Sequence, residues 1–243
     1  RLYRQNLAKT LELMTDLKDA FKTVEQISEE IQEKYNLMPS LSGCDEYKAH
    51  ERKLLSCLIN DKGTLSRVQK FAEKSAWQET DRAAYQAMEA LVHNLNTMHS
   101  RAGAQIPFSS INYGTDTSPE GRMAVRNLLL ATEAGLGNGE TPIFPIHIFK
   151  VKEGINYNPG DPNYDLFQLA CRVSAKRLFP NFSFLDAPYN LKYYSPGNPH
   201  TEIAYMGCRT RVIGNVYDPS REIVTGRGNL SFTSVNLPRL GIR

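Results

Sequence analysis

The sequence has few cysteines and no long apolar run. Its 243 residues contain four cysteines, Cys44, Cys57, Cys171 and Cys208, and no two of them form the close C-x-x-C pair of a zinc knuckle or a local redox dithiol. Scattered cysteines at this length do not indicate a disulfide framework. No apolar stretch reaches the roughly 20 residues of a membrane span, and the first residues do not resemble a signal peptide. We therefore expect a cytoplasmic protein without a membrane segment.

The charges are also nearly balanced. The sequence has 29 Lys and Arg residues against 26 Asp and Glu residues, which gives a net charge of +3, and no block of like charge is present. A nucleic-acid-binding surface is therefore not expected, although a nucleotide-sized anionic ligand is compatible with this charge. With 41% hydrophobic residues, the chain is long enough to bury a sizeable core in one large domain or two small ones.

The composition changes near residue 100. From Leu2 to about Lys34, apolar residues recur every three or four positions, which predicts one long amphipathic helix. Helical spacing returns weakly over residues 54–59 and clearly from about Leu65 to Met98. Residues 1–100 are therefore predicted to form a helical segment.

Beyond residue 101, short runs rich in Ile, Val and Phe alternate with stretches long enough for one helix. The predicted strands are Gln105–Tyr113, Ile143–Lys150, Asn181–Leu185, Val212–Asn215 and Leu230–Asn236, and the predicted helices are Pro119–Ala134 and Tyr164–Leu178. Alternation of strand and helix favours an α/β fold with parallel strands and crossover helices. Both half of a barrel and an open sheet fit this pattern for residues 101–243.

Three local motifs have ordinary structural interpretations. The glycine-rich residues 135–139 follow a predicted helix and precede a strand, which favours a helix C-cap and turn over a phosphate-binding loop. His93 and His99 lack the i, i+4 spacing of a helical metal pair, so no metal site is predicted. Residues 161–165 lie just before a helix, where Asp and Asn are favoured caps, although polar loops after strands also bind ligands in α/β folds.

Cys208 differs from the other cysteines. It lies beside Gly207 between two runs rich in Val, Ile and Thr, which indicates a thiol held on a tight loop. Arg209 and Arg211 would favour its thiolate, but no nearby histidine supplies a base, so an acyl-transfer triad is poorly supported. From these residues alone, a functional thiol and an incidental cysteine remain open alternatives.

Five segments in order resemble the anaerobic (class III) ribonucleoside-triphosphate reductase family, whose large subunit is a glycyl radical enzyme. They are residues 85–105, SSINYGTDTSPEGR at 109–122, GETPIFP at 139–145, MGCRTR at 206–211 and GRGNLSF at 226–232. The resemblance covers at least two thirds of the chain. It implies that residues 101–243 form about half of a ten-stranded α/β barrel, preceded by the long helices.

The resemblance also implies a chemistry for two residues. Cys208 matches the radical cysteine at the tip of the family's central loop. It would be oxidised to a thiyl by a glycyl radical that lies outside this chain. The thiyl would then abstract the ribose 3′ hydrogen so that the 2′-hydroxyl leaves as water. Asn229 matches the position where aerobic relatives carry a reducing cysteine, which implies formate as the reductant.

Further roles and partners follow from the same resemblance. Ser109, Ser110 and Asn112 would bind the ribonucleoside triphosphate substrate. Effector-binding residues for ATP or deoxynucleoside triphosphates would be Glu79, Gln86, Arg101, Lys152 and Asn163. The helix around residues 80–98 would lie at a homodimer interface, and a radical-SAM iron–sulfur enzyme would activate the protein.

Other parts of the family pattern have no counterpart in this sequence. They are the glycyl radical motif, the four-cysteine zinc site and the ATP-binding cone, and neither Cys44 nor Cys57 resembles the family's second active-site cysteine. We therefore expect a piece of the reductase that does not turn over alone. Two alternatives stay open: a formate-lyase-type glycyl radical enzyme, which normally carries adjacent cysteines, and a non-catalytic module for dimerisation and nucleotide sensing.

Overall fold

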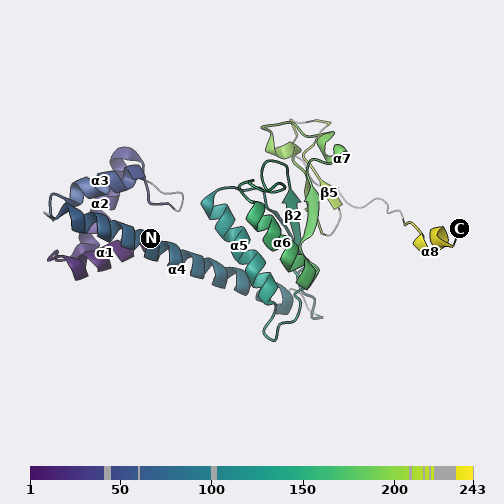
Figure 1. Ribbon diagram of the computed structural model, residues 1–243, viewed down its shortest axis with the longest axis horizontal. Helices are drawn as coiled ribbons and strands as arrows, with labels where there is room; N and C mark the ends of the chain where they lie inside the picture. Colours follow the sequence, from purple (N-terminus) through teal and green to yellow (C-terminus); the bar gives the residue numbers. More distant parts are fainter. Residues whose placement is uncertain are drawn as a thin grey trace. The chain divides into compact units, whose positions relative to one another are not determined.

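The computed structural model describes residues 1–40, 45–59, 61–99, 103–207, 210–215, 217–218, 220–221 and 234–242 (Figure 1). Two compact units are present, one made of residues 1–94 and 116–142 and the other of residues 95–115 and 143–243. Residues 116–142 thus cluster with the N-terminal unit, whereas the expected division near residue 100 assigned them to the C-terminal segment. Among the described residues, no helix combines the length and the apolar character needed to cross a membrane.

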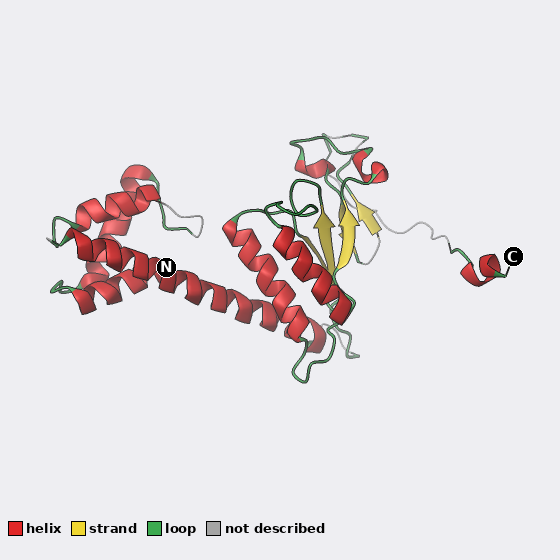
Figure 2. Ribbon diagram, in the orientation of Figure 1, coloured by secondary structure: helices red, strands yellow, loops and turns green. Residues whose placement is uncertain are grey.

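The first unit is helical (Figure 2). Its elements are α1 (Leu2–Met14), α2 (Ala20–Tyr35), α3 (Asp45–Leu55), α4 (Lys62–Thr97), whose last residues belong to the second unit, and α5 (Pro119–Ala134). The prediction of helices at 65–98 and 119–134 is confirmed. The weak helical signal over residues 54–59 corresponds only to the end of α3.

The single helix predicted from Leu2 to Lys34 is wrong, because the chain breaks between α1 and α2. Helix α1 ends at Met14 because the backbone of Thr15 is extended, with φ of −140° and ψ of 164°, and the Thr15 hydroxyl donates to the carbonyl of Leu11 at 2.7 Å. Asp19 has a left-handed backbone, with φ of 57°, immediately before α2. Leu17 continues the apolar spacing across this turn, so periodicity alone did not reveal it.

Side chains from α1 to α4 form the core of the first unit. Fully buried residues include Leu7 of α1, Ile31 of α2, Leu55 of α3 and Leu65 of α4. Burying one such side chain contributes about 1.5–3 kcal/mol. The apolar stripe of each helix therefore explains why these helices pack together.

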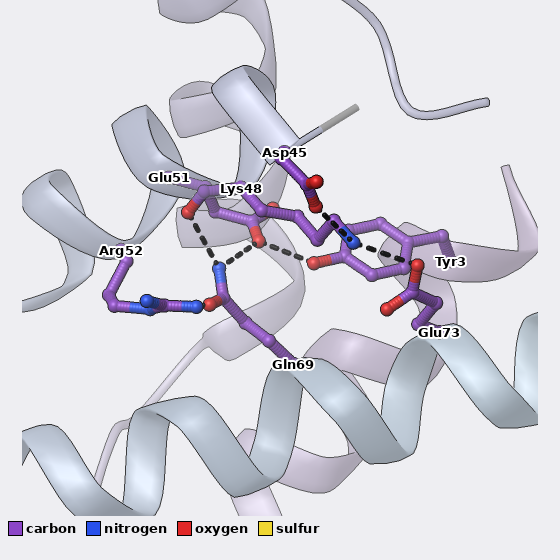
Figure 3. Close-up of polar contacts among 7 residues, drawn as sticks. All are labelled: Tyr3, Asp45, Lys48, Glu51, Arg52, Gln69 and Glu73. Atoms are coloured by element: carbon purple, nitrogen blue, oxygen red, sulfur yellow. Dashed lines mark hydrogen bonds and ion pairs between the residues drawn. The ribbon is translucent and has the colours of Figure 1, made fainter. Parts of the chain in front are cut away.

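A buried polar cluster crosses this core and links three helices (Figure 3). Glu51 of α3 is completely buried, and its Oε2 accepts hydrogen bonds from the Tyr3 hydroxyl of α1 at 2.6 Å and from Gln69 Nε2 of α4 at 2.8 Å. Arg52 Nε in turn donates to Gln69 Oε1 at 2.8 Å. Burial raises the pKa of Glu51 although these donors oppose the shift.

This burial predicts a pH-dependent stability. The folded state binds the Glu51 proton more tightly than the unfolded state does. The contribution of Glu51 to the free energy of unfolding is therefore fully present below the ordinary pKa of 4.5 and is lost as pH rises above it. We expect the free energy of unfolding to fall less in Glu51→Gln than in the wild type between about pH 5 and about pH 8. Urea unfolding followed by far-ultraviolet circular dichroism measures this difference.

The matched control is Glu73→Gln, which removes a carboxylate of α4 that pairs with Lys48 at the surface. Its pH dependence should follow that of the wild type. Equal losses of stability in the wild type and Glu51→Gln would contradict the expected titration of Glu51.

The second unit contains a parallel sheet of order β1-β2-β3. Its strands are β1 (Ser110–Tyr113), β2 (Ile146–Val151) and β3 (Asn181–Phe184), and α6 (Tyr164–Arg177) connects β2 to β3. Both strand pairs are parallel. The prediction of parallel strands with an intervening helix is confirmed, while β1 and β2 start later than their predicted runs.

The two faces of this sheet have different side chains. On one face, the Phe149 ring of β2 lies 5.7 Å from Tyr113 of β1 and 6.2 Å from Phe167 of α6, measured between ring centroids. His147 shares this face, and burial lowers its pKa to about 4. Because side chains alternate along a strand, Ser110 and Asn112 lie on the opposite face.

The remaining elements are short. They are α7 (Pro188–Leu191), the 3-10 helix η1 (Pro199–Thr201), β4 (Ala204–Met206), β5 (Thr210–Val212) and α8 (Leu237–Gly241). Strands β4 and β5 form an antiparallel pair. Strand β4 was not predicted, and β5 ends at Val212, where the predicted strand was to begin.

The predicted strand Leu230–Asn236 is only partly testable. Residues 230–233 lie outside the described part of the chain, and residues 234–236 are not in a strand. The described residues thus form a mixed α/β structure with parallel strands. The ten-stranded barrel stays a prediction.

Candidate functional site

The sheet face opposite α6 holds a strand that is distant in sequence. Asn112 Nδ2 donates to the carbonyl of Tyr205 at 2.8 Å, and Asn112 Oδ1 accepts from the amide of Tyr205 at 2.9 Å. A carboxamide offers a donor and an acceptor side by side, as a peptide group does. The Asn112 side chain therefore binds β4 as the backbone of a neighbouring strand would.

A second hydrogen bond joins β1 to the residue directly after β4. Ser110 Oγ accepts from the amide of Gly207 at 3.1 Å. Gly207 has φ of 61°, and a Cβ there would lie 3.3 Å from the Phe108 ring. Glycine suits this position because it adopts positive φ without strain and leaves room for that ring.

An ion pair anchors the segment before β4. Lys150 Nζ of β2 lies 2.6 Å from Glu202 Oε1, and only 13% of the Lys150 side chain is exposed. A charge-assisted bond in such a partly buried place is stronger than a surface pair. Sequence reasoning missed both residues, although a lysine inside the apolar run of β2 signals a charged partner.

The antiparallel pair β4–β5 is called the hairpin below, and its second strand, β5, also contacts the rest of the unit. Arg211 of β5 lies over the ring of Tyr189 in α7, with its guanidinium carbon 5.5 Å from the ring centroid. This distance is within the range of a cation–π interaction. Cys208, which falls between β4 and β5 in the sequence, lies outside the described residues, as does Asn229.

A second polar cluster lies at the carboxyl end of β1. The carbonyl of Gly114 accepts from Asn156 Nδ2 at 3.0 Å and from Asn163 Nδ2 at 3.1 Å, and both asparagines are fully buried. Asn156 Oδ1 also accepts from the amide of Lys152 at 2.9 Å. The loop from residue 152 to residue 163 is therefore fixed to the end of β1.

The predicted capping role of residues 161–165 is wrong for the side chain of Asn163. It occupies the N-cap position of α6, but its side chain makes no capping bond and donates to Gly114 instead. Asp161 Oδ2 accepts from the amides of Tyr157 and Asn158, at 2.9 and 2.8 Å, so it stabilises the loop rather than the helix.

The predicted effector residues fall in both units. Lys152 and Asn163 both belong to the loop between β2 and α6, where Lys152 Nζ lies 3.2 Å from the hydroxyl of Tyr194 and Asn163 donates to the carbonyl of Gly114. Glu79 and Gln86 are exposed residues of α4 in the first unit. Arg101 lies outside the described residues. Effector binding by these residues stays a prediction.

The predicted substrate residues lie together at the start of β1. Ser110 and Asn112 share the face that holds β4, whereas the Ser109 hydroxyl makes only a weak contact of 3.5 Å with the carbonyl of Pro107. Their contact with substrate stays a prediction.

Two other cysteines, Cys57 and Cys171, are exposed free thiols, and Cys44 lies outside the described part of the chain. Within the residues that the structure describes, no group of three or more His, Cys, Asp or Glu side chains could hold a metal ion. The described thiols thus belong to no metal-ligand cluster.

Comparison with known proteins identifies the family of the chain. The family model described as anaerobic ribonucleoside-triphosphate reductase matches residues 63–243. The chain therefore belongs to the anaerobic ribonucleoside-triphosphate reductase family, and the resemblance read from its five segments is confirmed.

Curated relatives carry the same name. The protein of Haemophilus influenzae is 34% identical over 165 residues, which are 67% of this chain and 22% of the relative. The protein of Escherichia coli is 35% identical over 172 residues, or 70% of this chain and 23% of the relative. The protein of Enterobacteria phage T4 is 36% identical over 168 residues, or 69% of this chain and 27% of the relative. The chain thus spans 22% to 27% of the length of these relatives.

The packing at Gly114 gives a stability prediction. Gly114 has φ of 124°, and a Cβ there would lie 2.8 Å from the carbonyl oxygen of Lys150. Gly154 also has positive φ, 77°, but a Cβ there would meet nothing within 4 Å. We expect Gly154→Ala to cost about 1–2 kcal/mol of stability from backbone strain alone, and Gly114→Ala about 1–3 kcal/mol more because of the clash. Chemical denaturation of the two variants measures the difference. Equal losses of stability would show that the short distance to the Lys150 carbonyl adds no cost of its own.

Proposed function

We propose that this chain supplies the radical cysteine loop and part of the substrate site of an anaerobic ribonucleoside-triphosphate reductase. This oxidoreductase converts ribonucleoside triphosphates to deoxyribonucleoside triphosphates with formate as the reductant. One observation carries the proposal: in a chain of this family, the two strands that flank Cys208 are fixed to the rest of the second unit. The side chain of Asn112 holds β4, Ser110 accepts from Gly207 directly after it, and Tyr189 contacts β5.

The proposed reaction uses the thiol of Cys208 as a carrier of one hydrogen atom. A glycyl radical, expected outside this chain, supplies the one-electron oxidation. The Cys208 thiyl takes the hydrogen atom from C3′, the C2′–O bond breaks, and the hydroxyl leaves as water with an added proton. Formate gives its hydrogen atom to C2′ and one further electron to the sugar, two electrons in all, and leaves as carbon dioxide. Cys208 then returns the first hydrogen atom to C3′. One ribonucleotide, one formate and one proton thus give one deoxyribonucleotide, one carbon dioxide and one water.

This chemistry fits the surroundings of the hairpin. Hydrogen-atom transfer uses the neutral thiol, so it needs neither a base nor a cation that stabilises a thiolate. Arg211 lies against the ring of Tyr189, which supports a structural role for this charge.

The remaining roles belong to the same proposal. The carboxamide of Asn229 can donate to formate or to a ribose hydroxyl but cannot form a disulfide, which suits a reductant that is not a dithiol. ATP and deoxynucleotide effectors, a homodimer and a radical-SAM activating enzyme complete the proposed system.

Anaerobic turnover tests the proposal in the full natural polypeptide that contains this chain. With the activating enzyme, a ribonucleoside triphosphate and carbon-13-labelled formate, the wild type should release one labelled carbon dioxide per deoxynucleotide. Cys208→Ala should lower product formation by at least about 10³-fold, because the hydrogen-atom carrier is lost. Asn229→Ala should lower product and labelled carbon dioxide together.

Cys171→Ala is the matched control, because it removes an exposed thiol of α6. It should keep wild-type turnover. Turnover by Cys208→Ala would refute the radical role of this loop, and deoxynucleotide formation without labelled carbon dioxide would refute formate as the reductant. Deoxynucleotide binding without any reduction by the wild type would favour the non-catalytic alternative.

A further inference from the structure

We infer that Asn112 is a positioning residue: its side chain replaces a strand backbone and fixes the register of the β4–β5 hairpin against β1. The structural part of this inference stands on the contacts of Asn112 alone. Its catalytic consequence rests on the proposed function, because Cys208 falls between β4 and β5 in the sequence.

Both bonds of Asn112 fall on one residue, Tyr205, which pairs with Arg211 in β5. The amide and the carbonyl of one residue in an antiparallel pair point to the same side of the strand. Asn112 therefore occupies the edge of β4 that does not face β5. It satisfies two backbone groups that would otherwise be left without a strand partner.

The contact of Ser110 sets the direction of the pairing. From Asn112 to Ser110 the chain steps back two residues, and from Tyr205 to Gly207 it steps forward two. The side chains of β1 thus bind β4 in the order of an antiparallel ladder. A shift of β4 by one residue would place Ala204 or Met206 opposite Asn112. The backbone amide and carbonyl of these residues point to the other side of the strand, so the contacts specify one register.

Few other side chains fulfil this role. An aspartate has no donor for the carbonyl of Tyr205, and a serine offers only one hydroxyl. The carboxamide of Asn112 uses one donor and one acceptor on the backbone of Tyr205. Its main task is therefore to hold the hairpin, which differs from the substrate contact expected from the family resemblance.

The catalytic consequence concerns turnover more than substrate affinity. Atom transfer requires the reacting atoms to lie about 3–3.5 Å apart, and a misplacement of about 1 Å costs about 10²-fold in rate. Loss of Asn112 should therefore lower kcat, whereas a residue that mainly binds substrate would raise KM when removed.

Hydrogen exchange of this chain, followed at single amides, tests the structural part. In Asn112→Ala, the Tyr205 amide should exchange about two- to tenfold faster, which corresponds to the loss of one hydrogen bond. In Ser110→Ala the same acceleration should appear at Gly207, while Ser109→Ala should leave both amides unchanged. An unchanged Tyr205 amide in Asn112→Ala would overturn the inference.

A second variant, with a side chain of the same size as asparagine, keeps the test valid if Asn112→Ala does not fold. In Asn112→Asp, an oxygen replaces the donor that faces the carbonyl of Tyr205 and repels it. The Tyr205 amide should again exchange faster than in the wild type. Wild-type exchange in a folded Asn112→Asp protein would overturn the inference.

Steady-state kinetics of the full natural polypeptide test the catalytic part. Asn112→Ala should lower kcat by about 10- to 100-fold, with KM within about twofold of wild type and with unchanged glycyl radical content by electron paramagnetic resonance. Asn198→Ala, which alters an exposed loop asparagine that accepts from the His200 amide, should keep wild-type kinetics. A raised KM with unchanged kcat would overturn the positioning role. If the wild type reduces no ribonucleotide, the proposed function fails, and the exchange experiment still decides the role of Asn112.

Discussion

The pair of hydrogen bonds between the Asn112 side chain and the backbone of Tyr205 joins residues 93 positions apart, and the arrangement of the candidate site depends on it. Strand β1 makes this possible because its two faces differ. Tyr113 packs with Phe149 on the face toward α6, which stabilises the sheet. The opposite face, with Ser110 and Asn112, is left to hold the hairpin. Strand β1 thus connects the aromatic core of the second unit to the candidate site on the opposite face of the sheet.

Asparagine side chains replace backbone pairing elsewhere in the second unit. Asn96 Oδ1 accepts from the amides of Ile143 and Phe144, at 2.8 and 3.0 Å, just before β2. Asn156 and Asn163 donate to the carbonyl of Gly114 at the other end of the sheet. Buried backbone groups require partners, and irregular segments next to a sheet obtain few from regular strand pairing. These side chains therefore give the loops around the sheet defined positions.

The sequence predicted the long elements better than the short ones. Helices α4, α5 and α6 and strand β3 lie where apolar periodicity and turn residues indicated, since those signals are local. The break between α1 and α2 was missed because Leu17 continues the apolar spacing, and β4 was missed because three residues carry almost no periodicity. The contacts of Asn112 and Lys150 could not be read locally, because their partners Tyr205 and Glu202 lie far along the chain. The family resemblance predicts roles for Cys208 and for the polar residues of β1, and these roles stay predictions, whereas the partners of Ser110 and Asn112 required the fold.

The central claim is that a thiol carried by this hairpin removes the 3′ hydrogen of a ribonucleotide. The most direct test compares anaerobic turnover of a ribonucleoside triphosphate with that of its 3′-deuterated form, in the full natural polypeptide with its activating enzyme. The account predicts slower turnover of the deuterated substrate, because breaking the C3′ bond to deuterium is harder. It also predicts that Cys208→Ala abolishes turnover of both substrates. Reduction of both substrates at the same rate, with or without Cys208, would contradict it.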